Sequence, residues 1–167
     1  MGRFGMFALL LSFLCFSCGS NDDSPEIEEL TNRGNVKFVM GDVEKSYTKG
    51  NSYISTRENI LLSFGNSSDE LVTFRIPLVE GADLPKTFDE NHKGGIISGG
   101  YKSGEDTYIA TNGINGIGRT GSFSVTVTSF ADGKISGTFT MTAKKAKSED
   151  AVSIKKGVFE DVKKLPD

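Results

Sequence analysis

Two runs of alternating apolar and polar residues between positions 121 and 145 predict a β-hairpin. In the first run Phe123, Val125 and Val127 alternate with serine and threonine, and in the second the alternation extends from Ile135 to Ala143. A period of two is typical of a strand with one buried face and one solvated face. We therefore expect a hairpin with one apolar face and one hydroxyl face.

The same pattern predicts how the two arms pair. Placing Val125 opposite Phe139 puts the apolar residues of both arms on one face, whereas a two-residue turn at Asp132-Gly133 would place apolar residues opposite polar ones. We therefore predict a three-residue loop, residues 131–133, with Gly133 left-handed in a G1 bulge.

Shorter alternating runs predict further strands between residues 36 and 110 and again between 152 and 159. Turn-forming residues separate them, as at Gly41-Asp42 and Lys49-Gly50-Asn51. Residues 80–104 are looser. Pro77 should end its strand because it lacks a backbone donor, and Gly157 should mark a bulge in the last strand.

No window of the chain has a sustained helical period. Roughly nine or ten short antiparallel strands without a helix predict an all-β fold. The architecture that suits them is a β-sandwich, with a closed β-barrel as the alternative.

The first 33 residues have a different composition. An apolar run at positions 4–17 follows Arg3, and it has the length of a signal-peptide core rather than of a membrane-spanning helix, which needs about 20 residues. A polar, acidic stretch follows it. We predict a signal peptide at 1–17, an acidic flexible tether at 18–33 and a single all-β domain at 34–167.

The end of the apolar run resembles the lipobox of bacterial lipoproteins, where a small residue precedes a cysteine. This resemblance implies cleavage after Ser17 and a thioether-linked lipid on Cys18, with further acyl chains giving a firm membrane anchor. The sequence departs from the pattern at Cys15, where leucine is usual, which makes Cys15 the poorer lipidation candidate. The acidic residues after Cys18 resemble the surface-export signal of Bacteroidota lipoproteins, which implies the outer face of the outer membrane.

The C-terminal third is similar to a family of Bacteroidota lipoproteins of unknown function. The motifs that carry the similarity are the alternating strand 122–130, the Asp132-Gly133 turn, the run Ile135-Ser136-Gly137-Thr138-Phe139 and the closing Gly157-Val158-Phe159. This resemblance implies no catalytic residues.

The charge balance and the positions of the cysteines bear on nucleic-acid binding and on disulfide formation. The chain has 19 basic and 22 acidic residues, and without a strong basic cluster we expect no nucleic-acid partner. Both cysteines, Cys15 and Cys18, lie in the N-terminal segment, so the domain itself should contain no disulfide.

Three patterns could signal chemistry, and each has a simpler interpretation. Residues 116–121 spell G-x-G-x-x-G, but a strand follows where a dinucleotide site needs a helix, so we expect a glycine-rich turn. His92 is the only histidine, which excludes a paired-histidine metal site and favours a solvated loop residue. Asp89 and Glu90 lack the spacing of a calcium loop. We predict no metal, no cofactor and no catalytic residue.

Tyr101 and Tyr108 are the best candidates for ligand contact. They flank the turn at Gly104, and the chain has no tryptophan to provide the flat aromatic face on which sugar-binding β-domains usually depend. The simpler alternative is that both rings are partly buried and their hydroxyl groups contact solvent.

Together these features predict a lipid-anchored lipoprotein of the outer membrane that faces the cell surface. It would act as a non-enzymatic binding or structural module, with an envelope glycan or a protein as its partner. One alternative is an envelope glycan hydrolase with a carboxylate pair, which a buried, converging pair of acids would favour. Another is an accessory subunit of an outer-membrane transporter.

Overall fold

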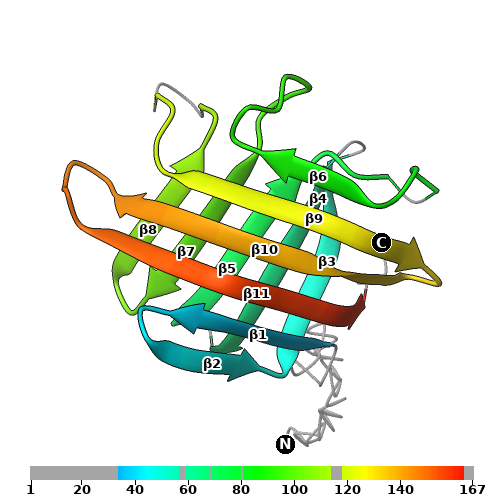
Figure 1. Cartoon of the computed structure of the whole chain (residues 1–167), viewed down its shortest axis with the longest axis horizontal. Coiled ribbons are helices and arrows are strands. Elements are labelled where there is room, and N and C mark those ends of the chain that lie inside the picture. Colours follow the sequence, from blue (N-terminus) through cyan, green and yellow to red (C-terminus); the bar gives the residue numbers. More distant parts are fainter. Residues whose placement is uncertain (1–33, 57–58, 68, 80, 114–117, 164–167) are drawn as a thin grey trace, which may run out of the picture.

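The computed structural model describes residues 34–56, 59–67, 69–79, 81–113 and 118–163 (Figure 1). Within these ranges the chain is all-β, as predicted, and it contains eleven strands and no helix. The strands are β1 (Asn35–Met40), β2 (Val43–Tyr47), β3 (Lys49–Thr56), β4 (Asn59–Ser67), β5 (Glu70–Ile76), β6 (Lys86–Asp89), β7 (Ser98–Ser103), β8 (Asp106–Thr111), β9 (Ser122–Ala131), β10 (Lys134–Lys145) and β11 (Ala151–Lys163).

The strands form two layers that cross steeply in Figure 1. The front layer has the order β6-β9-β10-β11-β1-β2 and the back layer the order β8-β7-β5-β4-β3, with antiparallel pairing throughout. The layers join where the end of β10 pairs with β8, at Lys144 opposite Ile109 and Lys145 opposite Tyr108. The fold is therefore the predicted sandwich, closed at one corner as a barrel would be.

The predicted register of the main hairpin is confirmed, but the predicted turn is wrong. Val125 lies opposite Phe139, and both side chains are buried. The loop, however, has two residues instead of three, because Ala131 pairs with Lys134. Asp132 and Gly133 have φ values of 52° and 66°, and positive φ at both central residues is what a type I′ turn requires.

The extra residue that restores the register lies inside β9. Ser129 pairs with Ser136, whereas Val127 pairs with Gly137, so that Thr128 is inserted as a bulge. Two exposed polar residues therefore follow the buried Val127 in a row. This break in the alternation marks the bulge in the sequence.

β11 contains two bulges with the same signature. The register of β11 slips at Lys156 and at Asp161, where φ is 53° and 52°. Each slip falls on two consecutive exposed residues, 155–156 and 160–161, between buried positions. The predicted bulge beside Gly157 is thus confirmed, with its inserted residue directly before the glycine.

Other local predictions have mixed outcomes. β5 ends at Ile76, directly before Pro77, as predicted. The predicted turn at residues 49–51 is wrong, because these residues begin β3 and pair with β4. β3 is an edge strand, where glycine and asparagine are tolerated more easily than in the middle of a sheet. β6 lies in the segment expected to be loose, and its only buried residue is Phe88.

The core is a cluster of phenylalanine rings centred on Phe139. The centroid of this ring lies 5.0 Å from that of Phe74, 6.0 Å from those of Phe38 and Phe64, and 6.3 Å from that of Phe159. These distances are typical of favourable aromatic pairs. Because Phe64 and Phe74 belong to the back layer, Phe139 connects the two layers at the centre of the sandwich.

Two glycine–phenylalanine pairs bring β10 and β11 together around this ring. Gly137 lies opposite Phe159, and Phe139 lies opposite Gly157. A Cβ atom on Gly157 would be 2.6 Å from three ring carbons of Phe139, and one on Gly137 would be 2.6 Å from the Phe159 ring. Each ring thus occupies the space above the glycine of the neighbouring strand.

We predict that Gly157→Ala lowers the free energy of unfolding by about 1–3 kcal/mol, because the added methyl group displaces the central ring. Urea unfolding followed by tyrosine fluorescence would measure the change. Gly118→Ala is the matched control, since a Cβ atom there meets nothing within 4 Å. Equal stability of the two variants would contradict the proposed close packing.

Candidate functional site

The outward side of the β9–β10 hairpin carries only hydroxyl side chains at residues 122–129 and 136–142; the end of the hairpin between these ranges has the exposed Ala131, Asp132 and Lys134. The buried residues of the two ranges point to the core, and nine outward residues remain there. We call them the hydroxyl face; they are Ser122, Ser124, Thr126, Thr128, Ser129, Ser136, Thr138, Thr140 and Thr142. Charged residues make up 25% of the chain, so about two would be expected among nine surface positions of average composition.

Pairing of the strands arranges these hydroxyls in rows. Ser124 lies opposite Thr140, and Thr126 lies opposite Thr138. β6 extends the second row, because the Oγ1 atoms of Thr87 and Thr126 are 2.8 Å apart. Neighbouring strands are about 4.8 Å apart and alternate residues about 6.7 Å, so the hydroxyls form a regular grid.

Three depressions lie along this face, with volumes of 400, 230 and 390 Å³. The first and second share Ser124 and Thr140, and the second and third share Thr138 and Val158. The depressions therefore form one shallow channel across β9, β10 and β11, which we call the hydroxyl groove.

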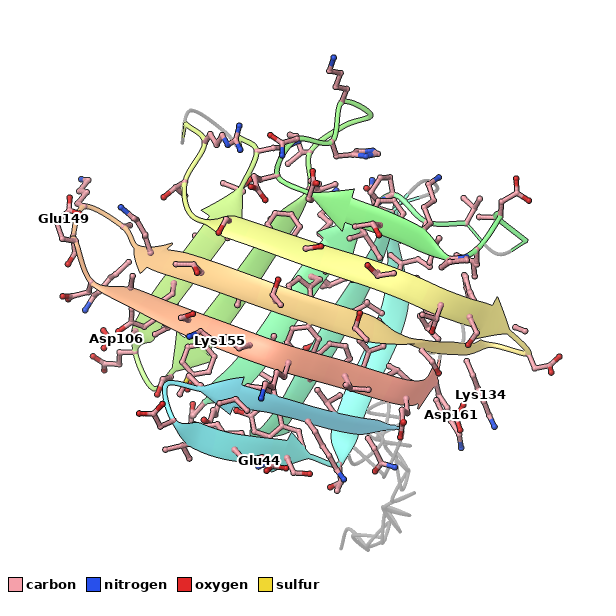
Figure 2. The ribbon with its side chains drawn as sticks, viewed as in Figure 1. Glu44, Asp106, Lys134, Glu149, Lys155 and Asp161 are labelled. Carbon is pink, nitrogen blue, oxygen red and sulfur yellow. The ribbon has the colours of Figure 1, made fainter. Side chains whose placement is uncertain are left out.

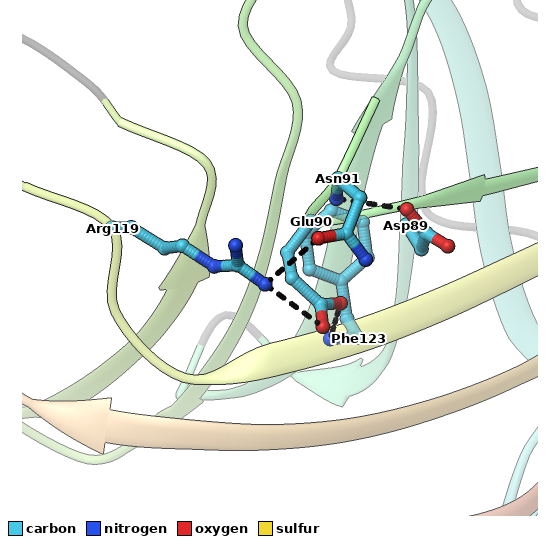
Figure 3. A network of polar contacts seen from close by, with 5 residues as sticks. All are labelled: Asp89, Glu90, Asn91, Arg119 and Phe123. Atoms are coloured by element: carbon cyan, nitrogen blue, oxygen red, sulfur yellow. Dashed lines mark hydrogen bonds and ion pairs between the residues drawn. The ribbon is translucent and has the colours of Figure 1, made fainter. Parts of the chain in front are cut away.

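A network of polar contacts holds the loops at the Ser122 end of the hydroxyl groove (Figure 3). Glu90 accepts a hydrogen bond of 3.1 Å from the Phe123 N–H and one of 3.4 Å from Arg119. Arg119 also donates to Asn91 Oδ1 at 3.0 Å, and the Asn91 N–H donates to Asp89 at 2.8 Å. The carboxylates of Asp89 and Glu90 thus border the groove in fixed positions.

The two tyrosines singled out in the sequence lie side by side on β7 and β8, with ring centroids 6.2 Å apart. Tyr101 is only 3% exposed, and its hydroxyl donates to Glu70 Oε1 at 3.0 Å. The same carboxylate oxygen accepts a hydrogen bond from Lys45 on β2. Tyr101 and Tyr108 are therefore brought together, and the Tyr101 hydroxyl belongs to a cluster that connects the two layers; ligand contact by these rings stays a prediction.

The charges of this cluster stabilise one another. The hydrogen bond from Lys45 lowers the pKa of Glu70 against the opposing effect of burial. Burial by itself would lower the pKa of Lys45, but its hydrogen bond and attraction to Glu70 outweigh this effect and raise it. Burial, followed by the proximity of Glu70, raises the pKa of Tyr47, whose hydroxyl is buried without a hydrogen-bond partner among the described residues.

A separate cavity of 560 Å³ lies at the corner where β10 meets β8, and Lys144, Lys145 and Lys147 contribute to its lining. Lys145 Nζ is 2.6 Å from Asp106 Oδ1, and Lys144 Nζ is 3.7 Å from Glu149 Oε2. Two of the three lysines are thus neutralised by neighbouring acids.

His92 lies in the loop between β6 and β7 with its ring centroid 5.6 Å from that of Phe88. Asn112 holds this loop, donating to the carbonyl oxygens of His92 at 3.1 Å and Gly95 at 2.9 Å. Sequence reasoning missed the role of Asn112, because a single polar residue at a strand end gives no distinctive pattern. Among the described residues, no three histidine, cysteine or acidic side chains gather as metal ligands would.

Two sequence features fall partly or wholly beyond the part of the chain that the structure describes. Cys18 lies outside it, and so do residues 114–117, which include the start of the glycine motif. The end of that motif, Gly121, has a φ of 63° and leads directly into β9. The described residues contain no helix of the length and apolarity needed to cross a membrane.

We predict that Glu70→Gln destabilises the protein by about 1 kcal/mol at neutral pH, because it weakens the contact between β2 and β5. The folded state lowers the pKa of Glu70 from its ordinary value of 4.5. The stabilisation is therefore present above this value and is lost as the pH falls through the lower folded-state pKa. Urea unfolding at neutral pH and at about pH 3 would measure the difference from the unsubstituted chain.

Glu105→Gln is the control for this experiment, because Glu105 is exposed at the β7–β8 turn. It should leave stability nearly unchanged at both pH values. A Glu70→Gln effect of the same size at acidic and neutral pH would show that the carboxylate charge is not its cause.

Comparison with known proteins gives a match for most of the chain. No curated protein and no solved structure matches it. A family profile described as "Domain of unknown function (DUF6252)" matches residues 35–163, from the first residue of β1 to the last residue of β11. The chain therefore belongs to this DUF6252 family.

Proposed function

We propose that the protein is a lipid-anchored lipoprotein of the outer membrane that displays a non-enzymatic binding module at the cell surface. The anchor would be Cys18, and the module would be the sandwich that follows the predicted tether. The observation that carries the binding role is the uncharged hydroxyl face, a broad polar surface that the packing of the core does not require.

The position of the sandwich in the chain supports the anchoring. Sixteen residues, 18–33, separate the module from the segment that resembles a signal peptide. A chain of this length spans at most about 55 Å when extended. Such a tether would let the module reach beyond the lipid headgroups while Cys18 stays in the membrane.

The packed interior of the sandwich indicates where a ligand could bind. The space between the layers is filled by packed aromatic and aliphatic side chains, and the buried polar residue among those described is Thr111. The hydroxyl of Thr111 donates to the carbonyl oxygen of Ile97 at 3.0 Å. The surfaces available to a ligand are thus on the outside of the layers.

The separation of two partly buried carboxylates, Glu70 and Glu90, also favours a binding module over a glycan hydrolase. Glu70 begins β5, whereas Glu90 lies in the loop that enters β7 beside the other end of β5, where Ser98 pairs with Arg75. Each carboxylate forms an ion pair, Glu70 with Lys45 and Glu90 with Arg119. A glycosidase needs two carboxyl groups about 5–10 Å apart, and Glu70 and Glu90 lie at opposite ends of a strand. Asp89 and Glu90 border the groove together, but each already accepts a hydrogen bond from a backbone N–H, Asp89 from Asn91 and Glu90 from Phe123.

We predict that Cys18→Ala shifts the protein from the membrane fraction to the soluble fraction of cells that process lipoproteins, because it removes the acceptor of the lipid. Fractionation and metabolic labelling with an alkyne fatty acid would measure the shift and the loss of acylation.

Cys15→Ala is the matched control, because it removes the neighbouring thiol and leaves Cys18 in place. This variant should remain acylated in the membrane fraction. Continued acylation of the Cys18→Ala protein would refute the anchor.

A further inference from the structure

The hydroxyl groove offers hydrogen bonds that the protein itself does not use. Among the described residues, the hydroxyls of Ser124, Thr138 and Thr140 have no protein partner, whereas Thr128 donates to the Ser136 carbonyl oxygen at 3.2 Å. Each unpaired hydroxyl supplies one donor and two acceptor positions. The centre of the groove therefore presents both donors and acceptors to a ligand.

The hydroxyl rows of β9 and β10 are uncharged, and charged residues line the groove beside them, with Lys156 at the central depression. Figure 2 labels Lys155 on β11, and Lys134 and Asp161 near the end where β10 begins and β11 finishes. Asp89 lies opposite Ser124 at the β6 side. The three depressions are lined by four acidic residues and two basic ones, Lys155 and Lys156, so an acidic polymer would gain no net attraction from the groove. A neutral ligand with many hydroxyls could pair with the uncharged rows.

The shape of the groove favours a long ligand over a small one. Its three depressions follow one another across three strands and are open to solvent. A single hydrogen bond contributes only about 0.5–1.5 kcal/mol net, so one sugar unit would bind weakly. A polymer that occupies several depressions, or several anchored copies of the protein, would bind more firmly by avidity.

We propose that the hydroxyl groove is a binding site for a neutral polysaccharide, lying across β9, β10 and β11 with the carboxylates of Asp89 and Glu90 at one end. This inference rests on the proposed function as a surface binding module, and it specifies the face and the chemical class of the ligand. The groove holds its ligand by hydrogen bonds from serine and threonine, without a platform of aromatic rings.

The test is native gel electrophoresis of the full chain in mild detergent, with polysaccharides cast into the gel. Dextran, galactomannan and laminarin are the neutral probes, and alginate is the acidic probe. We expect at least one neutral polymer to retard the protein and alginate to have no effect. The double variant Ser124→Ala/Thr140→Val should weaken this binding about tenfold, because two hydrogen bonds are lost.

Ser103→Ala/Thr107→Val is the matched control, because both residues are exposed hydroxyls on the back layer. It should bind like the unsubstituted chain. The proposal is overturned if no neutral polymer retards the protein, if alginate alone does, or if both double variants bind equally. Thermal unfolding of each variant would verify that the fold is retained.

The outcome is separable from that of the anchoring experiment. Membrane release by Cys18→Ala without any polysaccharide binding would overturn the ligand class and leave the anchored module standing. Polysaccharide binding by a chain that does not depend on Cys18 for membrane association would overturn the anchor and leave the groove standing.

Discussion

The rest of the structure depends on the close packing of Phe139 and Phe159 over the glycines of the neighbouring strand. Gly137 and Gly157 leave room for these rings, and Phe139 then reaches the rings of the back layer. Burying one such side chain contributes roughly 1.5–3 kcal/mol, whereas a partly exposed ion pair contributes about 0–1 kcal/mol. The aromatic cluster therefore decides the fold, and contacts such as Lys45–Glu70 adjust its edge.

The three bulges of β9 and β11 adapt these two strands to this packing. A strand with an unbroken period of two could not keep Ile154, Gly157 and Val162 on one face, because Gly157 lies an odd number of positions from each of the other two. Inserted residues at Lys156 and Asp161 return each following residue to the core. The bulge at Thr128 does the same for Phe130 in β9. The pairing of β9 with β10 is uninterrupted from Ser122 to Val127, which gives the hydroxyl face its regular rows.

The sequence predicted the fold class and the pairing of the main hairpin, because only one pairing places the large apolar side chains of both arms on one face. It misplaced the inserted residue of β9, since Asp132-Gly133 formed the turn its residues favour and the register was restored elsewhere. The polar pairs in β9 and β11 would have located all three bulges. The hydroxyl groove was less accessible to prediction: alternation shows which residues face outward, but not that β9, β10 and β11 align their depressions.

The alternation of residues along each strand gives the front layer one side that packs in the core and one side that faces the groove. Phe139 faces the core, while its neighbours Thr138 and Thr140 face the groove. Threonine suits an exposed strand position for its β-branched shape alone, so its presence on one strand carries little information. Its repetition opposite serine or threonine on the next strand, without a charge between them, is a stronger signal. The core places no demand on these outward residues, so the uncharged pattern is the observation on which the proposed binding site depends.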